Sequence, residues 1–323
     1  MSERKAYIDV ARGILILSVV LFHTPFVLRS VGCLGEVPFF DAFSSFYIVF
    51  FMPGFFFLTG YCTNWGGQIL IFLQRFIKQT ILPALVLPIF ASLFYFDKAV
   101  FANFLDFDSW TYSCVGWFIC ALAVAKLLYF CVRRLVKNGV LLFVVVLAVA
   151  VLGFVLNKSF ELPNHGFYQN GMILMFFVYL GDVARNISFS TEKISKYLGV
   201  GYVLVWLACS ILGFSLPNVM LSVNCSYLKF VPYFIIATMG ICLLMSFSKW
   251  VDTSRFFEYM GRHSLVIYFF HSVLIFQIGR LFDGICLCDN LMVLLVFVVV
   301  VALASFIAWL FDLPYLRWLV GRF

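Results

Sequence analysis

Long apolar stretches recur along the whole chain and are separated by short polar segments. Each of ten such stretches has about 17 to 25 residues, the length that a helix needs to cross a bilayer. They cover residues 6–28, 43–62, 80–96, 115–132, 139–156, 167–184, 198–214, 230–247, 264–282 and 291–312. The pattern predicts an all-α fold, a polytopic transmembrane helical bundle of about ten spans with no soluble domain. The stretches at 139–156 and 291–312 have almost no polar side chains, so we expect them to face lipid.

Composition agrees with a membrane protein. Of the 323 residues, 64% are hydrophobic and only 11% are charged, whereas soluble domains have about 25% charged residues. The N-terminus has a basic start and an apolar run, as signal peptides do. This run carries charges and lacks a small-residue cleavage site, so we expect a retained span. Nothing in the chain resembles a basic, aromatic-rich soluble segment, and we expect no nucleic-acid partner.

The net charge of +7 is distributed unevenly between alternate loops. One set of loops contains Arg4, Lys5, Arg75, Lys78, Arg133, Arg134, Lys137, Arg185, Lys193, Lys196, Lys249, Arg255, Arg262, Arg317 and Arg322. The other set contains only Arg29, Lys98, Lys158, Lys229 and Arg280. Because basic residues gather on the cytoplasmic side of membrane proteins, we expect the first set, and both termini, to be cytoplasmic.

The first stretch carries the most suggestive polar residues, Asp9, Arg12 and His23. Ionisable side chains inside a span are costly and usually functional. On a helix, Arg12 and His23 share one face, about 16 Å apart along the axis, and Asp9 lies one turn from Arg12. The alternative is that Asp9 and Arg12 are interfacial anchors and that His23 lies at the opposite headgroup layer.

Two later segments also have alternative interpretations. Pro53-Gly54 falls inside the second stretch, where it breaks the helical hydrogen bonds beside a cavity or simply kinks the helix. Arg75 and Lys78 lie one turn apart in a predicted inner loop before the third stretch. This pair suits phosphate, and it equally suits ordinary anchoring on the positive side.

Further candidates are weaker. Trp117 opens the fourth stretch, and Lys126 within it is expected to reach the inner headgroups. His165 in an outer loop and His271 in the ninth stretch are candidates for binding a polar acceptor or for structural roles. We expect Asp182 to pair with Arg185. No metal-binding spacing occurs, and we propose no metal.

Several segments, in chain order from residue 7 to about 310, resemble the acyltransferase family 3 membrane proteins. IDVARGILILSVVLFH resembles the opening Arg and His signature, and FFMPGFFFLTGYC the second span. QRFIKQTILP resembles an R-x-x-R segment with Lys78 in the second Arg position, which weakens bidentate phosphate binding there. GWFICAL and MGRHSLVIYFFH resemble two later motifs. The nearest type is the sugar O-acetyltransferase, such as fucose 4-O-acetyltransferase-like members.

The resemblance implies a single membrane acyltransferase domain over residues 1–323, in a bacterial cytoplasmic membrane. Such an enzyme moves an acetyl group from cytoplasmic acetyl-CoA, a co-substrate, to a hydroxyl of an extracytoplasmic or lipid-linked glycan. Arg12, Arg75 and Lys78 would bind the CoA end, and His23, with Asp9, would be catalytic. Trp117, His165 and His271 would contact the acceptor. His23 would act as a general base or form an acyl-histidine.

One other class of function fits the residues alone. A transporter or flippase of a lipid-linked glycan would also have about ten spans, a kinked helix and buried charge.

Overall fold

We describe a computed structural model of the chain, covering residues 5–93, 116–159, 167–186, 191–216, 229–282 and 288–321. Within these ranges the secondary structure is helical, without strands. The all-α prediction is confirmed. The helices are α1 (Ala6–Ser30), α2 (Pro38–Tyr47), α3 (Phe51–Cys62), α4 (Ile69–Phe76), the π-helix η1 (Ile77–Ile81), α5 (Leu82–Leu93), α8 (Gly116–Leu135), α9 (Gly139–Ser159), α10 (Phe167–Asn186), α11 (Thr191–Leu212), α12 (Phe230–Trp250), α13 (Arg255–Arg262), α14 (Ser264–Leu281), α15 (Asp289–Leu310) and the 3-10 helix η3 (Arg317–Val320).

The described helices match the predicted membrane spans closely. Eight helical segments are long and apolar enough to cross a membrane: Ala6–Ser30, Pro38–Cys62, Ile69–Leu93, Gly139–Leu156, Lys193–Leu212, Phe230–Trp250, Ser264–Leu281 and Asp289–Leu310. The other two predicted stretches are the 20-residue helices α8 and α10. Their charged residues near the ends, such as Arg133, Arg134 and Arg185, make them more polar than the rest. The chain is an integral membrane protein.

The helix of the second stretch is interrupted at a different place from the predicted one. The turn lies at residues 48–50, and α3 begins at Phe51, so Pro53 falls in its first turn. The first backbone N–H groups of a helix have no intrahelical acceptor, so proline costs little there. The break therefore precedes Pro53-Gly54 and is not centred on it.

The third span begins earlier than expected. The predicted inner loop before residue 80 is helical from Ile69, because Phe72, Phe76 and Thr80 recur at helical spacing and are buried. The prediction that Arg75 and Lys78 lie in a loop is therefore wrong. Pro83 follows η1 and has no N–H to give to the carbonyl four residues earlier, and a widened turn is one way to accommodate this.

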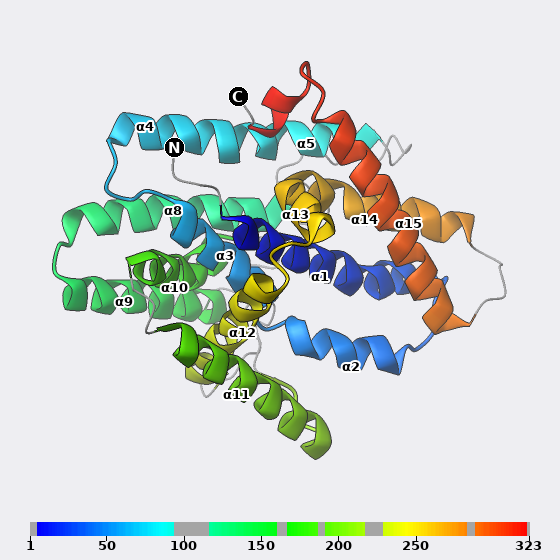
Figure 1. Cartoon of the computed structure of the whole chain (residues 1–323), viewed down its shortest axis with the longest axis horizontal. Coiled ribbons are helices and arrows are strands. Elements are labelled where there is room, and N and C mark those ends of the chain that lie inside the picture. Colours follow the sequence, from blue (N-terminus) through cyan, green and yellow to red (C-terminus); the bar gives the residue numbers. More distant parts are fainter. Residues whose placement is uncertain are drawn as a thin grey trace. The chain divides into compact units, whose positions relative to one another are not determined.

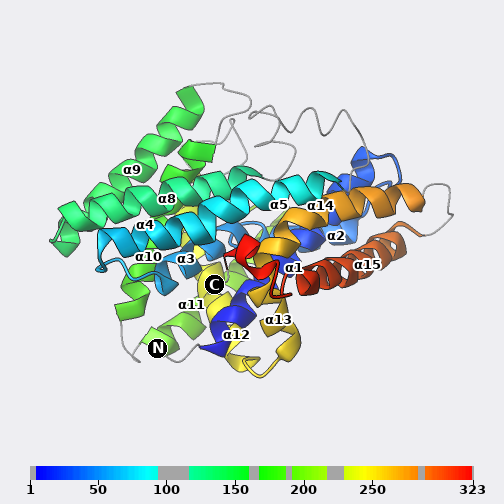
Figure 2. The same cartoon turned by 90° about the horizontal axis from the view of Figure 1, so that it is seen from above.

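The described chain forms two compact units, which we treat separately. The first contains α1, α2, α5, α13, α14, α15 and η3, drawn from residues 1–48, 82–115 and 247–323. Within it, α1 packs against α13, α14 and α15 (Figure 1). α14 also packs against α15 and α5, which Figure 2 shows from above. The buried face of α1 is therefore lined by elements from the C-terminal part of the chain.

The second unit contains residues 49–81 and 116–246. Its central helix is α10, which packs against α3, α8 and α9. Glycines permit the closest contacts. A Cβ on Gly60 would lie 2.0 Å from the Val178 carbonyl oxygen, and one on Gly181 would lie 2.1 Å from the Phe57 carbonyl oxygen. No larger residue fits at these two crossings of α3 and α10.

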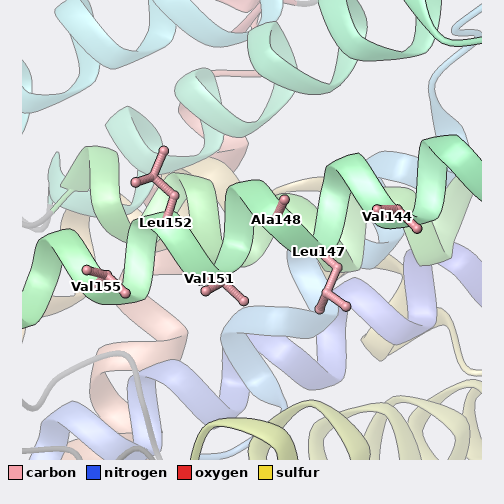
Figure 3. Close-up of a pocket in the computed structure, with 6 residues that line it drawn as sticks. All are labelled: Val144, Leu147, Ala148, Val151, Leu152 and Val155. Atoms are coloured by element: carbon pink, nitrogen blue, oxygen red, sulfur yellow. The ribbon is translucent and has the colours of Figure 1, made fainter.

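The predicted lipid-facing helices do expose apolar side chains. On α9 these include Val140, Leu141 and Val144, and on α15 Leu294 and Val298. A shallow hollow on α9 is lined only by aliphatic side chains (Figure 3). Its lining residues are Val144, Leu147, Ala148, Val151, Leu152 and Val155. Such a surface suits hydrocarbon and offers no group for acid, base or anion chemistry.

Candidate functional site

The helix α1 carries the principal site residues and is continuous from Ala6 to Ser30. Its polar side chains satisfy their hydrogen bonds within the helix. The Ser18 hydroxyl donates to the Ile14 carbonyl oxygen at 2.9 Å, and the Thr24 hydroxyl donates to the Val20 carbonyl oxygen at 2.8 Å. This arrangement is suited to a membrane interior, where water is absent. The predicted helical spacing of Arg12 and His23, about 16 Å along the axis, therefore holds.

Asp9 is the centre of a charge cluster at the beginning of α1. Its side chain is 2% exposed, and its Oδ1 lies 3.4 Å from Nη1 of Arg12, as the spacing predicted. Its Oδ2 lies 3.8 Å from Nε of Arg262, which also pairs with Glu258. A buried carboxylate is tolerated when opposite charges surround it. Sequence reasoning missed Arg262 as a partner, because it is about 250 residues away in the chain.

Two glycines bring this second arginine close to Asp9. A Cβ on Gly261 would lie 1.7 Å from the Asp9 carbonyl oxygen, and a Cβ on Gly13 would lie 2.0 Å from the Phe257 carbonyl oxygen. α1 and α13 thus meet backbone to backbone, and only glycine fits at either position. The sequence feature that could have indicated this contact is Gly261-Arg262, a glycine beside a charged residue directly before an apolar stretch.

His23 lies near the other end of α1 and is partly exposed. Its Nδ1 is 2.9 Å from the Val19 carbonyl oxygen. A carbonyl oxygen only accepts hydrogen bonds, so Nδ1 carries the proton and donates it. In the neutral ring Nε2 then has a free electron pair. This tautomer leaves Nε2 able to accept a proton or to attack an electrophile.

His271 on α14 lies beside His23, which the sequence did not predict. The two ring centroids are 4.9 Å apart with an interplanar angle of 64°. His271 is fully buried, its Nδ1 donates to the Tyr268 carbonyl oxygen at 2.6 Å, and its Nε2 lies 3.2 Å from the Ser272 hydroxyl. Both nitrogens are engaged, whereas His23 keeps one nitrogen available and remains accessible.

A third histidine, His263, was not among the sequence candidates. It lies at the junction of α13 and α14 and is 4% exposed. Its Nδ1 is 2.8 Å from the Tyr259 carbonyl oxygen, and its Nε2 pairs with Oδ2 of Asp312. Each ring nitrogen therefore has an oxygen partner. This pair ties the start of α14 to the segment after α15.

The second unit contains Arg75 and Lys78, both exposed, on α4 and η1. A further cation, Lys126 of α8, contacts this segment. Nζ of Lys126 donates to Oγ1 of Thr80 at 2.9 Å and lies 5.5 Å from the ring centroid of Phe76. Lys126 therefore bonds to a neighbouring helix, contrary to the expectation that it reaches the headgroups.

The remaining predicted residues have mixed outcomes. Trp117, at the start of α8, is partly exposed and contacts Phe118 edge to face. His165 lies outside the described residues. The prediction that Asp182 pairs with Arg185 is wrong. Oδ2 of Asp182 accepts from the Tyr129 hydroxyl at 2.7 Å and from Nε of Arg133 at 3.3 Å, and Arg185 donates to the Thr63 carbonyl oxygen.

In the described part of the chain no group of three His, Cys, Asp or Glu side chains is placed to hold a metal ion. The described residues include an accessible histidine with a fixed tautomer, and guanidinium groups beside a buried carboxylate. These groups suit proton transfer or nucleophilic attack together with anion binding.

Comparison with known proteins identifies the family. Neither the curated proteins nor the solved structures give a match. The model of a family described as an acyltransferase domain matches residues 5–313, nearly the whole chain. An enzyme is therefore favoured over a transporter or flippase. The chain belongs to acyltransferase family 3, the membrane acyltransferases that the sequence motifs resemble.

Proposed function

We propose that the protein is an O-acetyltransferase that uses cytoplasmic acetyl-CoA to acetylate a hydroxyl of an extracytoplasmic or lipid-linked glycan. The observation that carries the proposal is His23, which is accessible and has Nδ1 committed to the Val19 carbonyl oxygen. Its Nε2 is thereby free to take a proton from a hydroxyl. Family membership supports the acyl-transfer part of the proposal.

In this mechanism Nε2 of His23 removes the proton of the acceptor hydroxyl while the oxygen attacks the thioester carbonyl carbon. The carbon–sulfur bond then breaks, and the imidazolium returns the proton to the departing thiolate. The products are an acetyl ester and CoA with a free thiol. An acyl-histidine would instead form if Nε2 attacked the thioester first. The two routes are distinguished by incubating the enzyme with acetyl-CoA and no acceptor, quenching the reaction, and measuring the mass of the protein.

The donor's phosphates need positive charge, and Arg12 supplies it. In the described part of the chain Arg12 makes one long ion pair through Nη1, so its other N–H groups remain available to an anion. Asp9 lies fourteen residues before His23, about 21 Å along the helix. We therefore assign Asp9, with Arg262, to positioning Arg12 and not to the proton transfer. Arg75 and Lys78, both exposed, are proposed as CoA-binding residues on the sequence resemblance alone.

The experiment is acetyl transfer from radiolabelled acetyl-CoA by the purified chain in detergent micelles, with glycan fractions of the host envelope as acceptors. We expect label in the glycan fraction, released by mild alkali as an ester should be. Absence of both transfer and acetyl-CoA hydrolysis in a folded preparation would contradict the proposal. We expect the enzyme to act in a bacterial cytoplasmic membrane.

A further inference from the structure

Two neighbouring amides on α10 are buried without satisfying their oxygens. Gln169 is 1% exposed and Asn170 is 8% exposed. Among the described residues, Oε1 of Gln169 and Oδ1 of Asn170 have no hydrogen-bond partner. A buried acceptor without a donor is costly and rare in native proteins. Two consecutive examples at one end of a helix indicate that a donor comes from elsewhere.

The surroundings of this end of α10 show which residues lie at the same level. A Cβ on Gly171 would lie 2.7 Å from the Ala121 carbonyl oxygen of α8. Farther along the same two helices, Asp182 bonds to Tyr129 and Arg133. The two helices therefore run parallel, and residue 117, one turn before Ala121, lies level with residues 167–170. Trp117 occupies that position and is partly exposed.

An indole ring and two amide oxygens are a suitable combination for a sugar. The apolar face of a sugar ring packs on an aromatic side chain, and its hydroxyl groups donate to oxygens that have no other donor. A neutral polyol satisfies the amides without bringing charge into the membrane-buried part of the protein. The loop charges predict that this end of α8 and α10 faces the outside, where a glycan acceptor would arrive.

We propose that Trp117, Gln169 and Asn170 form a subsite for one sugar ring of the acceptor. This inference rests on the proposed glycan O-acetyltransferase function and extends it to Gln169 and Asn170, which no motif identified. The subsite gives a reason for the two unsatisfied oxygens, whose hydrogen bonds form only when the acceptor is bound.

The test is saturation-transfer NMR on the purified full chain in micelles, with the methyl glycosides of glucose, galactose and fucose as probes. We expect saturation transfer from the wild-type protein to at least one glycoside. Gln169→Met and Asn170→Leu remove the oxygens with little change in volume. Each should weaken glycoside binding at least tenfold while leaving the Tm unchanged or higher, because an unsatisfied buried oxygen is lost.

The matched control is Asn186→Leu, an amide at the opposite end of α10 that already donates to the Asp182 carbonyl oxygen. Glycoside binding should be unchanged in this variant. Trp117→Ala should also weaken binding tenfold or more, and Trp117→Phe should retain part of it. No glycoside binding by the wild type, or unchanged binding in all three subsite variants, would overturn the subsite. Acetyl-CoA hydrolysis, measured in parallel, tests the acetyltransferase proposal separately.

Discussion

His23 and its neighbour His271 differ in the hydrogen bonding of one ring nitrogen, Nε2. His23 and His271 lie side by side, yet His271 is buried and has both nitrogens engaged. A base needs an accessible electron pair, and only His23 of the two offers one. His271 is better suited to holding the ring of His23 in place. The two residues should therefore differ in their effects when mutated.

Arg12 should matter for the donor and Arg29, on the same helix, should not. Arg12→Ala removes N–H groups available to a phosphate, and hydrogen bonds to charged groups contribute about 1.5–3 kcal/mol. We expect acetyl-CoA affinity, measured by isothermal titration calorimetry, to fall by one to two orders of magnitude.

The matched control is Arg29→Ala, because Arg29 pairs with Asp41 at the other end of α1. Its donor affinity should equal that of the wild type. Arg262 remains beside Asp9 in the Arg12→Ala variant, so the buried carboxylate keeps a partner. Equal acetyl-CoA affinity in Arg12→Ala and wild-type protein would rule out the assignment of Arg12 to the donor.

Among the helices, the crossing of α1 and α13 depends on two glycines. Gly261→Ala would place a Cβ 1.7 Å from the Asp9 carbonyl oxygen, so the helices must separate. Overpacking of this kind typically costs about 1–3 kcal/mol. We expect a lower Tm by differential scanning fluorimetry and weaker acetyl-CoA binding, since Arg262 moves away from Asp9.

Gly139→Ala is the control for this substitution, because nothing lies within 4 Å of a Cβ on Gly139. Gly139→Ala should leave the Tm and acetyl-CoA binding unchanged, or raise the Tm slightly, because alanine favours helix. If Gly261→Ala behaved like Gly139→Ala, the close approach of α1 and α13 would be refuted.

The local sequence predicted where each helix lies better than it predicted which residues of distant segments contact each other. The apolar length sufficed for α1, α9 and α15, even though α1 contains Pro25. The segment Ile69–Ile81 was misjudged because its charges and the preceding glycines suggested a loop, although its apolar residues recur every three or four positions. The pairs Asp9–Arg262 and His23–His271 join distant parts of the chain. No spacing within one segment contains that information.

For the whole molecule, the uneven loop charge predicts an orientation. Lys137 and Lys193 belong to the basic set of loops, so cysteines substituted there should react with membrane-impermeant maleimide only after the cells are opened. Cysteine at Lys229, in the opposite set, should react in intact cells. Labelling of position 137 or 193 in intact cells would reverse the predicted orientation, and the acceptor would then approach from the other side.

The most direct test of the account is the acetyl transfer rate of purified His23→Ala protein, beside His271→Ala and the wild type. Loss of a general base lowers the rate by about 10²–10⁴-fold. We expect a loss of this size for His23→Ala, with acetyl-CoA affinity retained, and a smaller loss for His271→Ala. The wild-type rate should rise with pH as histidine loses its proton. Near-normal transfer by a folded His23→Ala protein would contradict the central role of His23.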